Sequence, residues 1–175
     1  TNGLRFQQEY AAYLDSLSYI GVRYPAEAVS VLDEGFDKGV ISRNNVTFNE
    51  RYNEAKARLA EDTRTLPGTI APAKASPKPM LSSLTADSFF SHKDYKTAKD
   101  LYESALSKGA VLDKDGGDQT DRTRFRLAMS KAMLGDYTGA KADFAMINNP
   151  NRKAIAEYWN MYIDQLSKPA AAPAT

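Results

Sequence analysis

Apolar residues recur at spacings of three and four along most of the chain, which is the pattern of amphipathic helices. The first such run extends from Leu4 to Ile20 and is followed by Gly21, a residue that tolerates the left-handed conformation of a helix end. Pro25 suits the first turn of a second helix, which we predict to stop at Gly39. Because only a few residues separate these two helices, they should form an antiparallel hairpin.

Two features mark the middle of the chain. The stretch TFNE, residues 47–50, predicts a capping box at the start of a third helix, in which a hydroxyl and a carboxylate satisfy free backbone N–H groups. We expect this helix to run to about Thr63. Residues 64–80 hold four prolines and almost no periodic pattern, so they are predicted to cross the surface as an extended linker.

The remaining sequence again has helical periodicity. Two further hairpins are predicted over residues 82–108 and 121–147, and a last helix should begin with Asn149 as its cap and Pro150 as its first residue, and run to about Leu166. Sustained alternation of apolar and polar residues, typical of strands, is not found, so the predicted class is all-α. The predicted organisation is a helical region over 1–63, the linker over 64–80, a helical region over 81–167 and a loose Ala/Pro-rich tail over 168–175.

Composition limits the kinds of function. The 23 basic and 22 acidic residues leave a net charge of +1, which provides no global field for nucleic acid or an anionic membrane. The sequence has no cysteine, which excludes disulfides and thiolate chemistry. No apolar run is long enough to span a bilayer, and residues 1–20 lack the pattern of a secretion signal. The absence of an initial methionine favours a longer precursor.

A repeat links the two later hairpins. The segments KDYKTAKDLY, residues 93–102, and GDYTGAKADF, residues 135–144, superpose on their tyrosines. Matched pairs of small or aromatic residues then coincide, and these are Ala86 with Ala128, Ala98 with Ala140, and Tyr102 with Phe144. Because two helices approach closely only where both carry small side chains, the alanines predict the contact positions of each hairpin.

This spacing resembles the tetratricopeptide repeat, which has a period of about 34 residues. The observed offset of 42 residues is longer, and the stretch VLDKDGGDQT can absorb the excess as an enlarged loop. The first hairpin fits less well, because Ala28 lies four residues after Tyr24 instead of three, and one extra residue in the turn explains the difference. The resemblance implies antiparallel hairpins stacked as an α-solenoid. The last helix would cap the open end of the stack, with its Trp159 and Tyr162 covering the last apolar face.

In such a solenoid the first helix of each hairpin lines a concave binding face. The groove positions that the resemblance implies are Tyr10, Tyr13, Leu17, Ser83, Asp87, Phe90, Arg122, Phe125, Met129 and Ala132. Phe125 and Met129 stand at two positions where one subclass grips a partner's terminal carboxylate with lysine and asparagine, which disfavours that mode. An apolar or aromatic groove for a peptide helix, or for a neighbouring segment of the protein's own precursor, is favoured instead. The alternative is that these side chains are packed between helices.

Other candidate sites have simpler interpretations. His92, the only histidine, has no evident catalytic or metal-binding partner and is interpreted as a surface turn residue. The loop DKDGGDQTD lacks the glutamate that a calcium loop needs at its twelfth position, so it is interpreted as a solvated loop in which Thr120 or Asp121 caps the next helix. Arg122 and Arg126 share a helical face, interpreted as solvated, while Arg124 points away.

These observations predict a non-enzymatic protein–protein interaction scaffold or accessory subunit, with no cofactor, no metal and no catalytic residues. The ending, from GDYTGAKADFAMI to IAEYWNMYIDQ, resembles C-terminal regions of alphaproteobacterial envelope or periplasmic repeat proteins. That resemblance implies a periplasmic or envelope location, with the cytoplasm as the alternative, and an outer-membrane or envelope complex as partner. The alternative functions are a sugar- or peptidoglycan-binding helical domain associated with an enzyme, and a purely structural piece.

Overall fold

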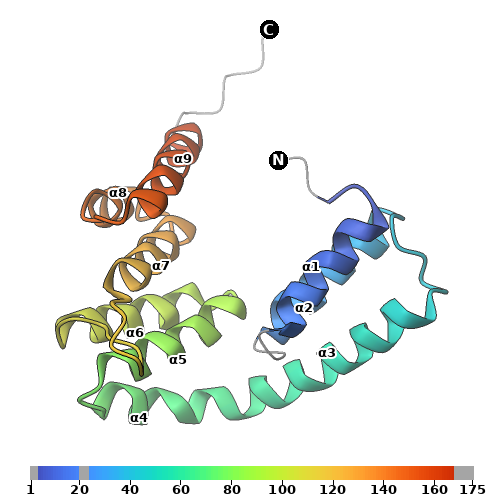
Figure 1. The fold of residues 1–175 in the computed structure, drawn as a ribbon, viewed down its shortest axis with the longest axis horizontal. Helices are drawn as coiled ribbons and strands as arrows, with labels where there is room; N and C mark the ends of the chain where they lie inside the picture. The colour runs from blue at the N-terminus through green and yellow to red at the C-terminus, as the bar shows by residue number, and fades with distance from the viewer. Residues whose placement is uncertain (1–3, 20–23, 168–175) are drawn as a thin grey trace, which may run out of the picture. The chain divides into compact units, whose positions relative to one another are not determined.

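A computed structural model describes residues 4–19 and 24–167, and within these residues the chain is helical (Figure 1). The elements are α1 (Gln7–Tyr19), α2 (Pro25–Asp37), α3 (Val46–Thr65), the 3-10 helix η1 (Leu66–Thr69), α4 (Ile70–Ala75), α5 (Pro79–Ser91), α6 (Tyr95–Ser107), α7 (Thr120–Met133), α8 (Tyr137–Ala145) and α9 (Pro150–Leu166). The all-α prediction is confirmed. The only β pairing in the described residues is one isolated antiparallel bridge between Leu112 and Asp118.

The chain divides into two compact units, Thr1–Thr69 and Ile70–Thr175. The boundary between them falls inside the segment predicted to be a linker. Each unit has its own apolar core.

In the first unit, α2 packs against both α1 and α3. Its core contains Tyr10 and Leu14 from α1, and Leu32 and Phe36 from α2. Gly35 permits a close approach at the centre of this core, because a Cβ atom there would lie 2.6 Å from the Ile41 side chain. The predicted end of the first helix at Gly21 lies outside the described residues.

The predicted capping box at the start of α3 is wrong. Asn45 is the N-cap, and its side-chain oxygen accepts a hydrogen bond from the backbone N–H of Phe48 at 3.3 Å. The backbone at Asn45 is extended, so the helix begins at Val46 and Thr47 lies inside its first turn. Asparagine is at least as favourable an N-cap as threonine, and here it lies two residues earlier in the sequence.

Residues 64–80 are mostly helical, so the prediction of an extended linker is also wrong. They contain the end of α3, then η1, α4 and the start of α5. Pro67, Pro72 and Pro79 each lie within the first three residues of a helical element. Proline is tolerated there because the N–H groups of a first turn have no intrahelical acceptor.

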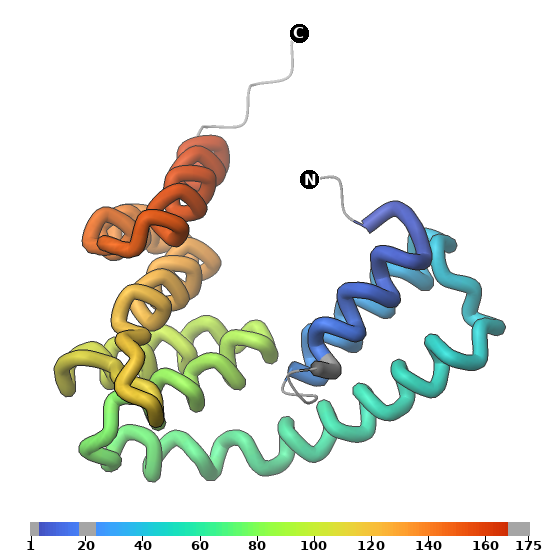
Figure 2. Tube along the Cα trace, in the orientation of Figure 1, coloured from blue at the N-terminus to red at the C-terminus, as the bar shows by residue number. Residues whose placement is uncertain are grey.

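The second unit contains two helical hairpins, α5/α6 and α7/α8, followed by α9, which packs against α7 and α8 (Figure 2). Helix α7 also packs against both helices of the first hairpin. The four alanines of the sequence repeat, Ala86, Ala98, Ala128 and Ala140, are fully buried. Small residues therefore stand where the helices of each hairpin come together.

The two hairpin turns have the same geometry. Lys93 and Gly135, which are equivalent in the repeat, have left-handed backbone conformations with φ of 62° and 81°. Asp94 and Asp136 follow as N-caps, and each accepts a hydrogen bond from the backbone N–H three residues later, at 3.0 Å and 2.9 Å. The repeated Asp–Tyr pair thus consists of a helix cap and the first residue of the second helix.

The two remaining helix starts differ in outcome. Asn149 caps α9, as predicted, with its side chain accepting from the backbone N–H of Arg152 at 3.1 Å. Neither Thr120 nor Asp121 caps α7. The hydroxyl of Thr120 accepts from the backbone N–H of Val111, and the carboxylate of Asp121 accepts from the backbone of the α8–α9 connection. Both side chains are therefore used to hold loops.

Candidate functional site

The groove residues predicted in the first unit do not share an exposed face. Tyr10 is fully buried, and its hydroxyl donates to the backbone oxygen of Leu4. Tyr13 is half-buried and donates to the carboxylate of Glu27 on α2. Leu17 is half-buried and lines an open, largely aliphatic pocket between α1, α2 and α3. Tyr10 is therefore a core residue and cannot line a groove.

In the second unit, two of the predicted groove residues form a buried seam between α5 and α7. The hydroxyls of Ser83 and Thr123, both fully buried, lie 2.8 Å apart. One turn along, the carboxylate of Asp87 accepts from the Arg122 guanidinium at 2.6 Å and from the Tyr102 hydroxyl at 2.7 Å. Asp87 is only 3% exposed, so it fixes the seam and is not available to a partner.

The seam also changes the acidity of its tyrosine. Burial raises the pKa of Tyr102 far above the ordinary value, and the neighbouring Asp87 carboxylate raises it further. The phenol therefore remains protonated and continues to donate to Asp87. This arrangement joins α5, α6 and α7 through one carboxylate.

Next to the seam, a cation rests on an aromatic ring. The guanidinium carbon of Arg126 lies 4.9 Å from the ring centroid of Phe90, and Phe90 in turn makes an edge contact with Tyr95 at 5.3 Å. Both Arg126 and Phe90 are partly exposed. The aromatic contact fixes the direction of the arginine head group at the protein surface.

Large apolar side chains are exposed on both α5 and α7. Leu81 and Leu84 of α5 are 44% and 41% exposed, and Met133 of α7 is 47% exposed. On α7, Arg122, Arg126, Met129 and Met133 follow one another at spacings of four, three and four, which places them on one side of the helix. We name Leu84, Arg126 and Met133 the α5–α7 face.

Phe125 and Met129 belong mainly to the core of the second unit. Phe125 makes an edge contact with Phe144 at 5.4 Å, and Phe144 stacks on Trp159 of α9. Met129 packs partly buried against the same cluster. Most of the surface of these two side chains is therefore packed between helices, which was the alternative to a groove.

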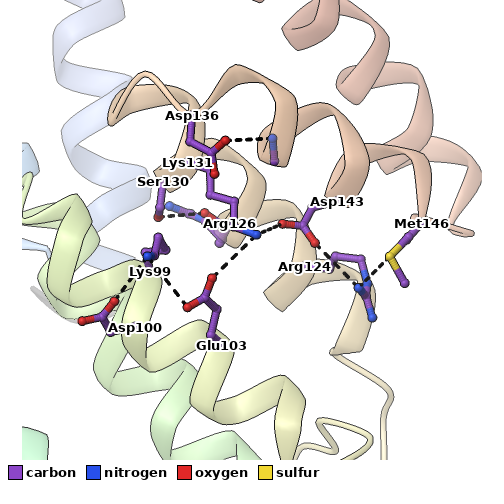
Figure 3. Close-up of polar contacts among 11 residues, drawn as sticks. Lys99, Asp100, Glu103, Arg124, Arg126, Ser130, Lys131, Asp136, Asp143 and Met146 are labelled. Carbon is purple, nitrogen blue, oxygen red and sulfur yellow. Dashed lines mark hydrogen bonds and ion pairs between the residues drawn. The ribbon is translucent and has the colours of Figure 1, made fainter.

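The other side of α7 is a compact set of ion pairs (Figure 3). Lys131 lies 2.7 Å from Asp143 of α8 and 3.6 Å from Glu103 of α6, and Arg124 lies 3.8 Å from the same Asp143 and 3.2 Å from the sulfur of Met146. Burial alone would lower the pKa of Lys131, but its hydrogen bond to Asp143 and the nearby carboxylates raise it above the ordinary value. The prediction that Arg124 points away from the side of α7 that carries Arg122 and Arg126 is confirmed.

The remaining candidates show no chemical site. His92 is the half-buried C-cap of α5. The carboxylate of Asp113 accepts from two backbone N–H groups of its own loop, which lower its pKa. Within the described part of the chain, no group of acidic or histidine side chains could hold a metal ion, and no helix is both long and apolar enough to cross a membrane.

The sequence interpretation missed Leu84 and Met133, although a signal for both was present. The repeat offset of 42 residues pairs Leu84 with Arg126 and Ser91 with Met133, and these positions lie on the open sides of α5 and α7. The predicted groove set instead used the neighbouring positions Ser83 and Asp87, which the packing of α7 against α5 buries.

Comparison with family models, with curated proteins and with solved structures gives no match.

Proposed function

We propose that this protein is a non-enzymatic protein–protein interaction module that binds a segment of a partner on its α5–α7 face. The observation that carries the proposal is that two large apolar side chains, Leu84 of α5 and Met133 of α7, are more than 40% exposed on helices that also present Arg126, held over the Phe90 ring. Exposed apolar groups gathered on one face are typical of interaction surfaces.

The scaffold beneath this face supports the proposal. Ser83, Asp87, Tyr102 and Thr123 are buried and hydrogen-bonded, and Arg122 closes the same network, so the face rests on a hydrogen-bonded seam. A preformed surface loses little conformational entropy on binding. The similarity of the sequence to tetratricopeptide repeats, whose first helices bind partner segments, points in the same direction. Placement in a bacterial envelope assembly rests on sequence resemblance alone and stays a prediction.

A selection from a phage-displayed library of random peptides of about 15 residues, roughly four helical turns, tests this function. We expect the wild-type chain to enrich a peptide family that the double variant Leu84→Ser/Met133→Ser does not bind. The control is Val46→Ser, because Val46 is 69% exposed but lies in the other unit. Equal peptide binding by the Leu84→Ser/Met133→Ser variant, with its helix content unchanged by circular dichroism, would refute the proposed face.

A further inference from the structure

The basic residues of α7 differ in how their charge is balanced. Arg122 pairs with Asp87 at 2.6 Å, Lys131 pairs with Asp143 at 2.7 Å, and Arg124 lies within 4 Å of the same Asp143. Arg126 is different, because no carboxylate oxygen lies within ion-pair distance of it in residues 4–19 and 24–167.

The Asp87 carboxylate of α5 does not serve as the ion-pair partner of Arg126. Asp87 is the one acidic residue of α5, and its two oxygens are already occupied, one by the Tyr102 hydroxyl and the other by Arg122. Two exposed apolar side chains share its position by repeat and by helical spacing: Leu84 is the equivalent of Arg126 in α5, and Met133 lies two turns further along the same side of α7. The face therefore presents one positive charge among aliphatic groups.

We infer that the α5–α7 face recognises an acidic amphipathic segment, in which a side-chain carboxylate of aspartate or glutamate pairs with Arg126 and flanking aliphatic residues cover Leu84 and Met133. This inference rests on the proposed function and specifies its partner. The charge complementarity is one carboxylate to one guanidinium, whose planar donors match a carboxylate geometrically.

The contact with Phe90 makes this pairing favourable. A free surface arginine must give up rotamer freedom to form an ion pair, and such pairs contribute little to binding. Here the guanidinium is already held 4.9 Å from an aromatic ring, and its side chain is partly buried. Less freedom is lost on binding, and the partial burial of the side chain reduces screening by water.

The selection described above also tests the partner's chemistry. Peptides enriched on the wild-type chain should contain an aspartate or glutamate flanked by leucine, isoleucine or methionine. In solution, with the enriched peptide made as a C-terminal amide, Arg126→Gln should weaken binding about tenfold, as expected for one charge-assisted pair. Replacing the peptide's acid by its amide should weaken binding to wild type by the same factor, and should change binding to Arg126→Gln little, because the two changes remove one interaction.

Lys96→Gln is the charge-matched control, because it removes one positive charge from α6, where Lys96 is 81% exposed and close to Asp100. It should leave peptide affinity unchanged. Enriched peptides without acidic residues that still require Leu84 and Met133 would overturn this inference and leave the proposed function standing. Independent, additive effects of the peptide and Arg126 changes would also overturn it, as would binding that requires a free C-terminal carboxylate. If no peptide is enriched, both the inference and the proposed function fail.

Discussion

Removal of the Asp87 carboxylate should strongly destabilise the second unit. Asp87→Ala leaves the fully buried Tyr102 hydroxyl without its acceptor and the partly buried Arg122 guanidinium without its counter-ion. Breaking a buried ion pair typically costs about 3 to 5 kcal/mol. Because the Arg122 side chain remains 23% exposed and can regain some hydration, we expect the low end of that range, about 3 kcal/mol.

The only tryptophan makes the measurement specific to the second unit. Trp159 lies on α9 and stacks on Phe144, so its fluorescence in urea reports the unfolding of the unit that contains Asp87. Asp87→Asn retains the volume and one acceptor and should cost about half as much as Asp87→Ala. The control is Asp100→Asn, whose carboxylate makes only long surface contacts with lysines and should change stability by less than about 0.5 kcal/mol.

Two results would refute this reasoning. One is a loss below about 1 kcal/mol for Asp87→Ala, which is the value of an ordinary hydrogen bond. The other concerns the double variant Asp87→Leu/Arg122→Leu, which removes both charges. Its loss of stability should be smaller than the summed losses of the two single variants. A double variant as unstable as that sum would show that the two side chains do not act as a pair.

Two further predictions use the same fluorescence assay. The raised pKa of Tyr102 means that the folded state favours the neutral phenol. The stabilisation that this provides is present below the pKa of the unfolded state, about 10, and is lost as the pH rises above it. Tyr102→Phe should therefore reduce the loss of folding stability above about pH 10, and an unchanged dependence of stability on pH would contradict the assignment. Asn149→Ala removes the α9 cap on the backbone N–H of Arg152 and should cost about 1 kcal/mol, whereas a cost near zero would show that the cap contributes nothing.

Local sequence signals predicted the helices well and their surroundings less well. Pro25 and the Asn149–Pro150 pair mark helix starts correctly because capping depends on a few neighbouring residues. Asn45 was missed because two adequate caps, Asn45 and Thr47, compete within three residues. The extended linker was wrong because prolines were treated as helix breakers, although those at the start of a helix are tolerated.

Helical periodicity does not reveal which residues on one side of a helix are covered by a neighbouring helix, and the predicted groove residues illustrate this. Residues 83, 84 and 87 all lie toward one side of α5, yet Ser83 and Asp87 are buried and Leu84 is 41% exposed. The difference is set by where α7 packs across α5, which depends on the Ser83–Thr123 and Asp87–Arg122 contacts between hairpins. Such contacts link residues 35 to 40 positions apart and leave no periodic signal along the chain.

The proposed function connects the Asp87–Arg122 pair with Arg126, which lies one turn further along α7 and is partly exposed. If Arg122 were free, the α5–α7 face would present two positive charges one helical turn apart and would favour strongly acidic segments of many kinds. Asp87 neutralises Arg122 inside the seam, and this leaves Arg126 as the charge available to a partner. If the proposed function holds, the carboxylate that holds α5 against α7 also limits this face to one available positive charge, so Asp87 affects both the stability of the second unit and the choice of partner.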